Sequence, residues 1–183
     1  DKTAKWNFET DVVTGDMALY AKQEKVTLPA YTESAVYTGE ALSCGLTTCE
    51  DYTVTYTQNG ETATPVKAGE YTVTVALKEG MKWEDGTNAN KTFTFTVAKK
   101  NVTAPTADET VYKYTGEEQT YTIAESADYT VTGNKQTAVG EHTVTVALTD
   151  AENTQWADGT TDVKTFTFTI SKKDVTAPAA DET

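Results

Sequence analysis

The sequence contains no arginine, only one histidine and only two cysteines among its 183 residues. Its 28 acidic residues outnumber 15 basic residues, all lysine, and the formal net charge is −13. Contacts to nucleic-acid phosphates depend on clustered lysine and arginine, and base recognition depends heavily on bidentate arginine. We therefore expect that this acidic chain does not bind nucleic acid.

Long apolar runs are also absent. No stretch approaches the roughly 20 consecutive apolar residues that a membrane-spanning helix needs, so we expect no membrane insertion within these residues. Because Asp1 is not a natural translation start, we expect any signal peptide or cell-wall anchor to lie outside these residues.

An internal repeat dominates the residues that are present. The segments GEYTVTVALK and KTFTFTVAKK, within residues 69–100, return as GEHTVTVALT and KTFTFTISKK within residues 140–173. Trp83 and Trp156 lie 73 residues apart, and earlier matched positions lie 76 apart. Repetition at a fixed period predicts an array of similar modules.

The repeat divides the chain into four segments. These are residues 1–25, an N-terminal segment of another kind; 26–101, the first module; 102–174, the second module; and 175–183, the start of a third repeat or a terminal strand. The final VTAPAADET nearly repeats VTAPTADET at 102–110, so we expect these residues to come from a longer array. Modules this small bury only about 60% of their unfolded surface, which predicts modest stability for each.

Apolar and polar residues alternate with a period of two through both modules, as in half-buried strands. Tyr71, Val73 and Val75 fall on one face of an expected strand, and Thr72 and Thr74 fall on the other. β-Branched threonine suits a pleated, half-exposed surface. Antiparallel sheets tolerate one solvated face, so the pattern predicts an all-β fold of tandem antiparallel β-sandwiches.

Turn signals separate the expected strands. Asn59-Gly60 is the dipeptide most typical of a two-residue hairpin. Gly133-Asn134 occupies the corresponding place in the second module, where the hairpin is six residues shorter. About seven short strands per module, separated by turns, are typical of an immunoglobulin-like sandwich.

Several short motifs together resemble the Ig-like repeats of bacterial surface proteins. They are Tyr-Thr-Gly at 37–39 and 114–116, the DYTVT runs that begin at Asp51 and Asp128, and the two Trp-x-Asp-Gly-Thr turns. Such repeats occur in tandem in surface and secreted proteins of Gram-positive bacteria. The resemblance covers residues 26–183, and it implies a scaffold rather than a particular activity.

The N-terminal segment resembles the C-terminal half of an internalin-type B repeat (Listeria/Bacteroides repeat), a small β-grasp-like extracellular module. The matching residues are Trp6, Phe8, Thr10, Asp11, Val13, Thr14, Gly15, Asp16, Leu19, Tyr20, Ala21 and Lys22. Gln23 replaces the usual final tryptophan, and the first strand and helix of that family are missing. The resemblance implies surface display, and the incomplete segment is expected to pack on the first module or to pair with another chain as a donor strand.

The connection between the modules is short. Val97–Asn101 runs directly into Val102 with no glycine- or serine-rich spacer, which favours a semi-rigid string of modules. We therefore expect non-catalytic spacer, or stalk, modules of a multidomain bacterial cell-surface or secreted protein. Their location is then extracellular, and their partners are the neighbouring Ig-like repeats of the same chain.

The alternative function is that of an adhesin-like or carbohydrate-binding module, with a host protein or a glycan as its partner. Trp83 and Trp156 are the candidate ligand contacts, because an exposed indole can stack on the apolar face of a sugar. The competing interpretation is that each indole covers one end of its own sandwich core.

Cys44 and Cys49 lie in ALSCGLTTCED, and their counterparts in the second module are Tyr121 and Ser126. Outside the cytoplasm, a disulfide that closes this short loop is the expected state. A reduced pair and a metal site are the alternatives, although zinc needs four ligands and no second cysteine or histidine pair is present.

No constellation of catalytic residues emerges, so we expect no enzymatic activity and no cofactor. His142 occupies the position of Tyr71 in the other module, which favours a structural role. Turn carboxylates such as Asp85 and Asp158 are candidate calcium ligands, but too few lie close in sequence for the six to eight oxygens that calcium takes. Asn101 becomes Asp174 in the second module, which excludes a shared Lys–Asn crosslink there and leaves other crosslinks open.

Overall fold

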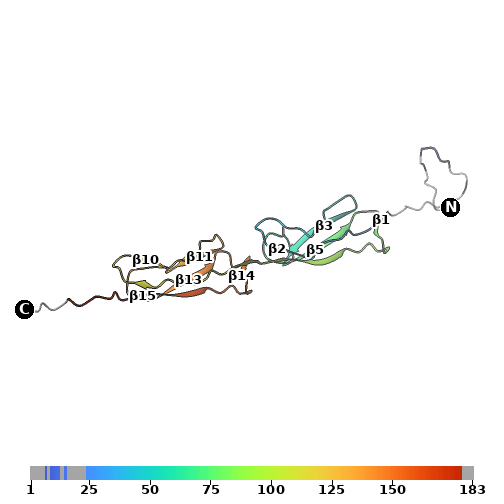
Figure 1. The fold of residues 1–183 in the computed structure, drawn as a ribbon. Helices are drawn as coiled ribbons and strands as arrows, with labels where there is room; N and C mark the ends of the chain where they lie inside the picture. Colours follow the sequence, from blue (N-terminus) through green and yellow to red (C-terminus); the bar gives the residue numbers. More distant parts are fainter. Residues whose placement is uncertain (1–6, 8, 13–14, 16–23, 179–183) are drawn as a thin grey trace, which may run out of the picture.

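The computed structural model describes residues 7, 9–12, 15 and 24–178. These residues form strands, turns and irregular segments but no helix, and thus no helix that could span a membrane. The all-β prediction is confirmed. Two strand-rich modules follow one another along a common axis (Figure 1).

The first module contains seven strands in two sheets. The strands are β1 (Glu24–Val26), β2 (Ser34–Val36), β3 (Tyr52–Gln58), β4 (Glu61–Thr62), β5 (Gly69–Leu77), β6 (Met81–Trp83) and β7 (Lys91–Ala98). One sheet has the order β2-β7-β5-β3-β4, and β1 pairs with β6 in the other.

The second module contains eight strands in three sheets. The strands are β8 (Lys100–Val102), β9 (Tyr112–Lys113), β10 (Gln119–Thr120), β11 (Tyr129–Thr132), β12 (Lys135–Gln136), β13 (Gly140–Leu148), β14 (Thr154–Trp156) and β15 (Lys164–Ser171). The largest sheet has the order β11-β13-β15-β9, and the pairs β10-β12 and β8-β14 complete the module.

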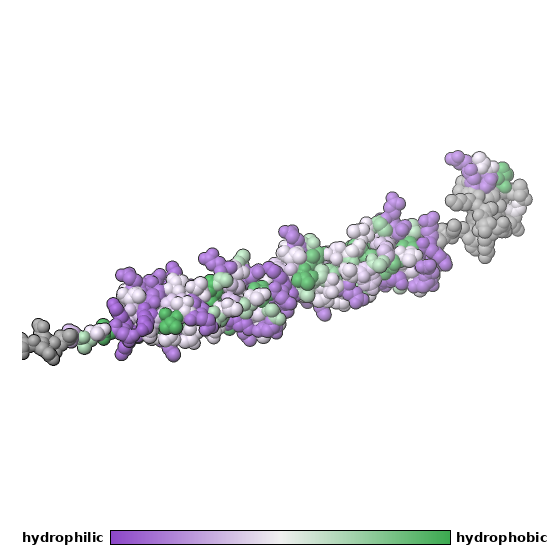
Figure 2. Space-filling view, viewed as in Figure 1, coloured by the Kyte–Doolittle hydropathy of each residue, from purple (hydrophilic) through white to green (hydrophobic). Residues whose placement is uncertain are grey.

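The long central strands place the predicted apolar face in the core. Val73 and Val75 of β5 are completely buried, as are Val144 and Val146 of β13. Alternate threonines on these strands lie on the other face and are exposed or half-buried, which explains how a threonine-rich strand packs well. Hydrophobic residues reach the visible surface only in small separate patches among hydrophilic ones (Figure 2).

Several short strand pairs are parallel, although the principal pairs are antiparallel as predicted. The parallel pairs are β1-β6, β2-β7, β8-β14 and β9-β15. The solvated threonine face favours antiparallel pairing of the long strands, but a two-residue period does not set the direction of short edge strands. The sequence pattern therefore did not predict these parallel pairs.

The two modules differ at their hairpins. Asn59 and Gly60 have φ values of 52° and 84° and join β3 to β4, which confirms the predicted two-residue turn. The hairpin expected at Gly133-Asn134 does not form in the same way, because β12 pairs with β10 and not with β11. The chain turns away from β11 at Gly133, where an added Cβ would lie only 2.4 Å from the Thr143 carbonyl oxygen.

Two strands begin slightly before the predicted boundaries of the modules. β8 begins at Lys100, two residues before the expected start of the second module, and β1 begins at Glu24. Most of the N-terminal segment that resembles a B repeat lies outside the described residues. In the expected third repeat, residues 175–178 are in no strand, and residues 179–183 lie outside the described part.

Candidate functional site: the joint between the modules

A single residue, Lys99, separates the last strand of the first module from the first strand of the second. The Lys100 amide donates to the Asn153 carbonyl oxygen at 3.0 Å. β8 then pairs with β14 in parallel register from Lys100 opposite Thr154 to Val102 opposite Trp156. The connection is thus part of the second module's strand structure from its first residue.

The turn between β13 and β14 forms the other side of the joint. The amides of Asn153 and Thr154 donate to the Asp150 carbonyl oxygen, and the Asn153 Nδ2 donates to the Asp150 carboxylate at 2.8 Å. The Thr154 hydroxyl donates to the same carbonyl oxygen at 2.6 Å. Asn153 and Thr154 are the only buried polar residues in the described part of the chain. Because buried polar groups are costly unless they are bonded, this network holds the turn in one conformation.

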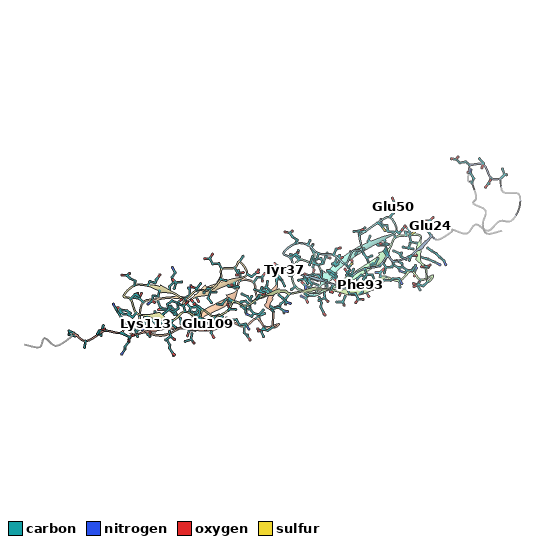
Figure 3. The ribbon with its side chains drawn as sticks, viewed as in Figure 1. Glu24, Tyr37, Glu50, Phe93, Glu109 and Lys113 are labelled. Atoms are coloured by element: carbon teal, nitrogen blue, oxygen red, sulfur yellow. The ribbon has the colours of Figure 1, made fainter. Side chains whose placement is uncertain are left out.

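Three hydrogen bonds join this turn to the first module, in addition to an exposed ion pair between Lys67 and Glu152. The Ala68 amide donates to Asn153 Oδ1 at 2.8 Å, and the Tyr37 hydroxyl donates to Asp150 Oδ2 at 3.4 Å. Lys99 Nζ donates to the Ala151 carbonyl oxygen at 2.7 Å. Tyr37 lies where the two modules meet (Figure 3). Because the contacts come from different segments of the first module, together they restrain bending of the joint in more than one direction.

Charge at the joint is arranged around Asp150 and a neighbouring ion pair. The hydrogen bond from the Asn153 side chain lowers the pKa of Asp150, and the Asn153 amide and Tyr37 hydroxyl act in the same direction. Lys100 pairs with Asp128 at 2.9 Å within the second module. A small open groove of about 260 Å³ lies between these groups and Tyr37. Because its pKa is lowered, Asp150 is ionised at neutral pH and accepts these hydrogen bonds as a carboxylate.

The joint-forming turn is specific to the second module. The first module connects Leu77 to Trp83 through five residues, whereas the second connects Leu148 to Trp156 through seven. The shorter turn contains neither an aspartate nor an asparagine. The sequence thus contains a signal for the joint, a turn two residues longer in the second module, but the joint was not predicted from it.

Trp83 and Trp156 are not surface platforms for a sugar. Their exposed fractions are 1% and 0%. Trp83 Nε1 donates to the Ala89 carbonyl oxygen and Trp156 Nε1 to the Asp162 carbonyl oxygen, each at 2.7 Å. The candidate ligand contacts are therefore core residues, as the competing interpretation expected, because burying a large indole with its N–H satisfied stabilises a small module.

The predicted Cys44–Cys49 disulfide is not formed: both thiols are free. Cys44 is completely buried and its sulfur accepts a hydrogen bond from the Tyr56 hydroxyl at 3.1 Å, whereas Cys49 is exposed. The first thiol packs in the core and the second lies at the surface, so the short sequence spacing did not bring them into a bond.

The two thiols are expected to differ strongly in reactivity. An aromatic disulfide reagent should modify one thiol per folded chain, at Cys49, and the second only after unfolding in urea, because Cys44 is sealed in the core. A colour assay of thiol release with and without urea measures both. The variant Cys49→Ser should show no reactive thiol when folded. Two reactive thiols in the folded chain would contradict this packing of Cys44.

The turns that follow the tryptophans are closed by their own aspartates. Asp85 Oδ1 accepts from the Thr87 amide at 2.8 Å and hydroxyl at 2.6 Å, and Lys91 pairs with its other oxygen at 3.2 Å. Asp158 repeats the arrangement with Thr160 and Lys164. The described residues contain no group of three or more acidic, histidine or cysteine side chains arranged to hold a metal.

The aspartates of these turns predict that the stability of the fold decreases at acid pH. The Thr87 and Lys91 hydrogen bonds lower the pKa of Asp85 from 3.8 to about 2, and similar bonds depress the pKa of Asp158. A carboxylate with a depressed folded pKa stabilises the fold above its unfolded pKa, near 3.9, and loses that contribution as pH falls through the folded value. Urea midpoints should therefore be level above about pH 5 and decline toward pH 2.

A double variant, Asp85→Asn with Asp158→Asn, tests the cause of that decline. It should lower the urea midpoint at neutral pH and flatten the decline below pH 5, because two of the titrating groups are gone. An unchanged acid profile in the double variant would show that other carboxylates control it.

His142 has the structural role that its repeat position predicted. Its Nε2 donates to the Ala138 carbonyl oxygen at 2.8 Å, and its ring packs near Phe168. In the first module, the Tyr71 hydroxyl donates to the Lys67 carbonyl oxygen at 2.9 Å. Both side chains thus bond to the carbonyl four residues earlier.

No protein-family model matches this chain, and no curated protein matches it. Its role must therefore be inferred from the geometry of the modules and their joint.

Proposed function

We propose that residues 26–174 are non-catalytic, Ig-like spacer modules that act as a stalk in a multidomain bacterial surface or secreted protein. The contacts across the joint support this proposal more than any other feature. A stalk must transmit orientation from one module to the next, and a one-residue connection with three hydrogen bonds between the modules restricts reorientation. The end-to-end arrangement of the modules is consistent with this role (Figure 1).

The proposed location is extracellular, and the proposed partners are neighbouring repeats in the same chain. The resemblance of the Tyr-Thr-Gly and Trp-x-Asp-Gly-Thr motifs to bacterial surface repeats supports both. An acidic, hydrophilic surface also suits an extended, solvent-exposed spacer. The buried indoles of Trp83 and Trp156 remove the basis for the carbohydrate-binding alternative, so we do not propose it.

Residual dipolar couplings of the whole chain test the stalk proposal directly. If the joint is semi-rigid, couplings from both modules should fit a single alignment tensor. Asn153→Ala removes the side chain that accepts from Ala68 and bonds to Asp150, so the two modules should then require different tensors. The amide spectrum of each module should otherwise be retained.

Glu152→Ala is the matched control at the same turn. Glu152 forms only an exposed pair with Lys67 at 3.6 Å, with side chains 80% and 70% exposed. Exposed pairs contribute about 0–1 kcal/mol, so a single tensor should persist. Separate tensors in the unmodified chain would refute the semi-rigid spacer.

A further inference from the structure

Strand β11 of the second module presents an uncovered edge. The Thr149 amide donates to the Asp128 carbonyl oxygen, which makes this residue pair a hydrogen-bonded one immediately before β11 pairs with β13. Hydrogen-bonded and non-hydrogen-bonded pairs alternate along antiparallel strands. The main-chain groups of Tyr129 and Val131 therefore point away from β13, toward the outside of the sheet.

The first module covers the same edge with its own chain. The main-chain groups of Tyr52 and Val54, the counterparts on β3, also point outward by the same register. The Cys49 amide donates to the Tyr52 carbonyl oxygen at 3.0 Å, and the Val54 amide donates to the Thr48 hydroxyl at 2.9 Å. The segment that contains Thr48 and Cys49 thus lies beside β3 and bonds to two of its outward main-chain groups, the Tyr52 carbonyl oxygen and the Val54 amide.

The second module lacks this cover. Among the described residues, the Val131 amide and the Tyr129 carbonyl oxygen, which correspond to the two bonded groups of β3, have no hydrogen-bond partner. Glu125 and Ser126 replace Thr48 and Cys49 in the covering segment. The Ser126 hydroxyl instead accepts from the Asp128 amide at 3.1 Å, which turns the segment back on itself.

An open groove of about 730 Å³ lies along this edge. Its apolar lining includes Tyr121, Ile123, Tyr129 and Val131. In the first module, Leu46 occupies the position of Ile123 and is buried, whereas Ile123 is only partly buried. In the first module, its own side chains and main chain thus occupy the space beside β3. The corresponding space beside β11 stays open.

We propose that this groove binds an extended peptide of a partner protein, which adds to β11 as a further strand. Unpaired main-chain donors and acceptors at strand spacing match a peptide backbone, and a neighbouring apolar groove receives alternate side chains. The Thr48–Cys49 segment of the first module is the template for the position of this peptide. The proposal is independent of the spacer role.

Charge defines the peptide further. Lys135 in the groove pairs with Glu118 at 3.7 Å, whereas Glu125 has no ion-pair partner among the described residues. The whole chain carries a net charge of −13. Neutral or basic peptides are therefore favoured over acidic ones.

Panning a random heptapeptide phage library against the whole chain tests the proposal. The selected peptides should bind the unmodified chain and bind Val131→Pro about tenfold or more weakly, because proline removes the outward amide but no bond to β13. The control Val54→Pro alters the edge that Thr48 already covers and should leave peptide affinity unchanged. Calorimetry shows whether each variant is folded.

Hydrogen exchange in the unmodified chain gives a test that does not depend on a variant. The Val131 amide should exchange rapidly without peptide and become protected when a selected peptide is added. Failure to select any peptide, equal binding to Val131→Pro, or an unprotected Val131 amide would overturn the proposal. A dimer in sedimentation equilibrium that Val131→Pro abolishes would identify a second copy as the occupant and would also overturn it.

Discussion

Trp156→Ala is expected to unfold the second module and leave the first module folded. Replacement of a fully buried tryptophan by alanine costs about 3–5 kcal/mol, and the Trp156 indole also donates to the Asp162 carbonyl oxygen. A module of this size is expected to have a total stability of about 4–11 kcal/mol. The substitution therefore removes much or all of the stability of the second module.

Calorimetry together with the amide spectrum measures this effect. The transition and dispersed resonances of the second module should be lost, and those around Trp83 should remain. Val163→Ala, at a half-exposed position before β15, should change neither module. Loss of both modules together would show that the joint couples them into one folding unit, and no change in either would refute the importance of this indole.

Gly133→Ala should destabilise the second module by about 3 kcal/mol. Its φ of 75° is a left-handed conformation that costs an L-residue roughly 1–2 kcal/mol. A Cβ at this position would also lie 2.4 Å from the Thr143 carbonyl oxygen, so β13 would have to move. A displaced central strand adds a cost typical of overpacked positions, about 1–3 kcal/mol.

Gly159→Ala separates these two causes. Gly159 has a φ of 82°, but a Cβ there would meet no atom within 4 Å. It should therefore lose only the conformational part, about 1–2 kcal/mol. Urea unfolding of both variants provides the comparison. Equal losses would mean that β13 accommodates the methyl group at Gly133 without cost.

The strands and the buried face were predictable because they depend on local periodicity. Tyr71, Val73 and Val75 alternate with threonine in the sequence, and the structure buries these three side chains. The Asn59-Gly60 turn was predictable for a similar reason, since its positive φ values are a property of two adjacent residues. The cysteine pairing was wrong because proximity in sequence does not determine which side of a loop faces the core.

The repeat alone thus established an all-β protein of tandem modules with threonine on its exposed strand faces, because side-chain alternation needs only neighbouring residues. Tertiary structure decided which copy closes its outer strand edge and which turn reaches across to the other module. Asp150 and Asn153 acquire their role only by lying against Tyr37 and Ala68, more than 80 residues earlier. Contacts at that separation depend on how whole strands are placed, and no local pattern contains that information.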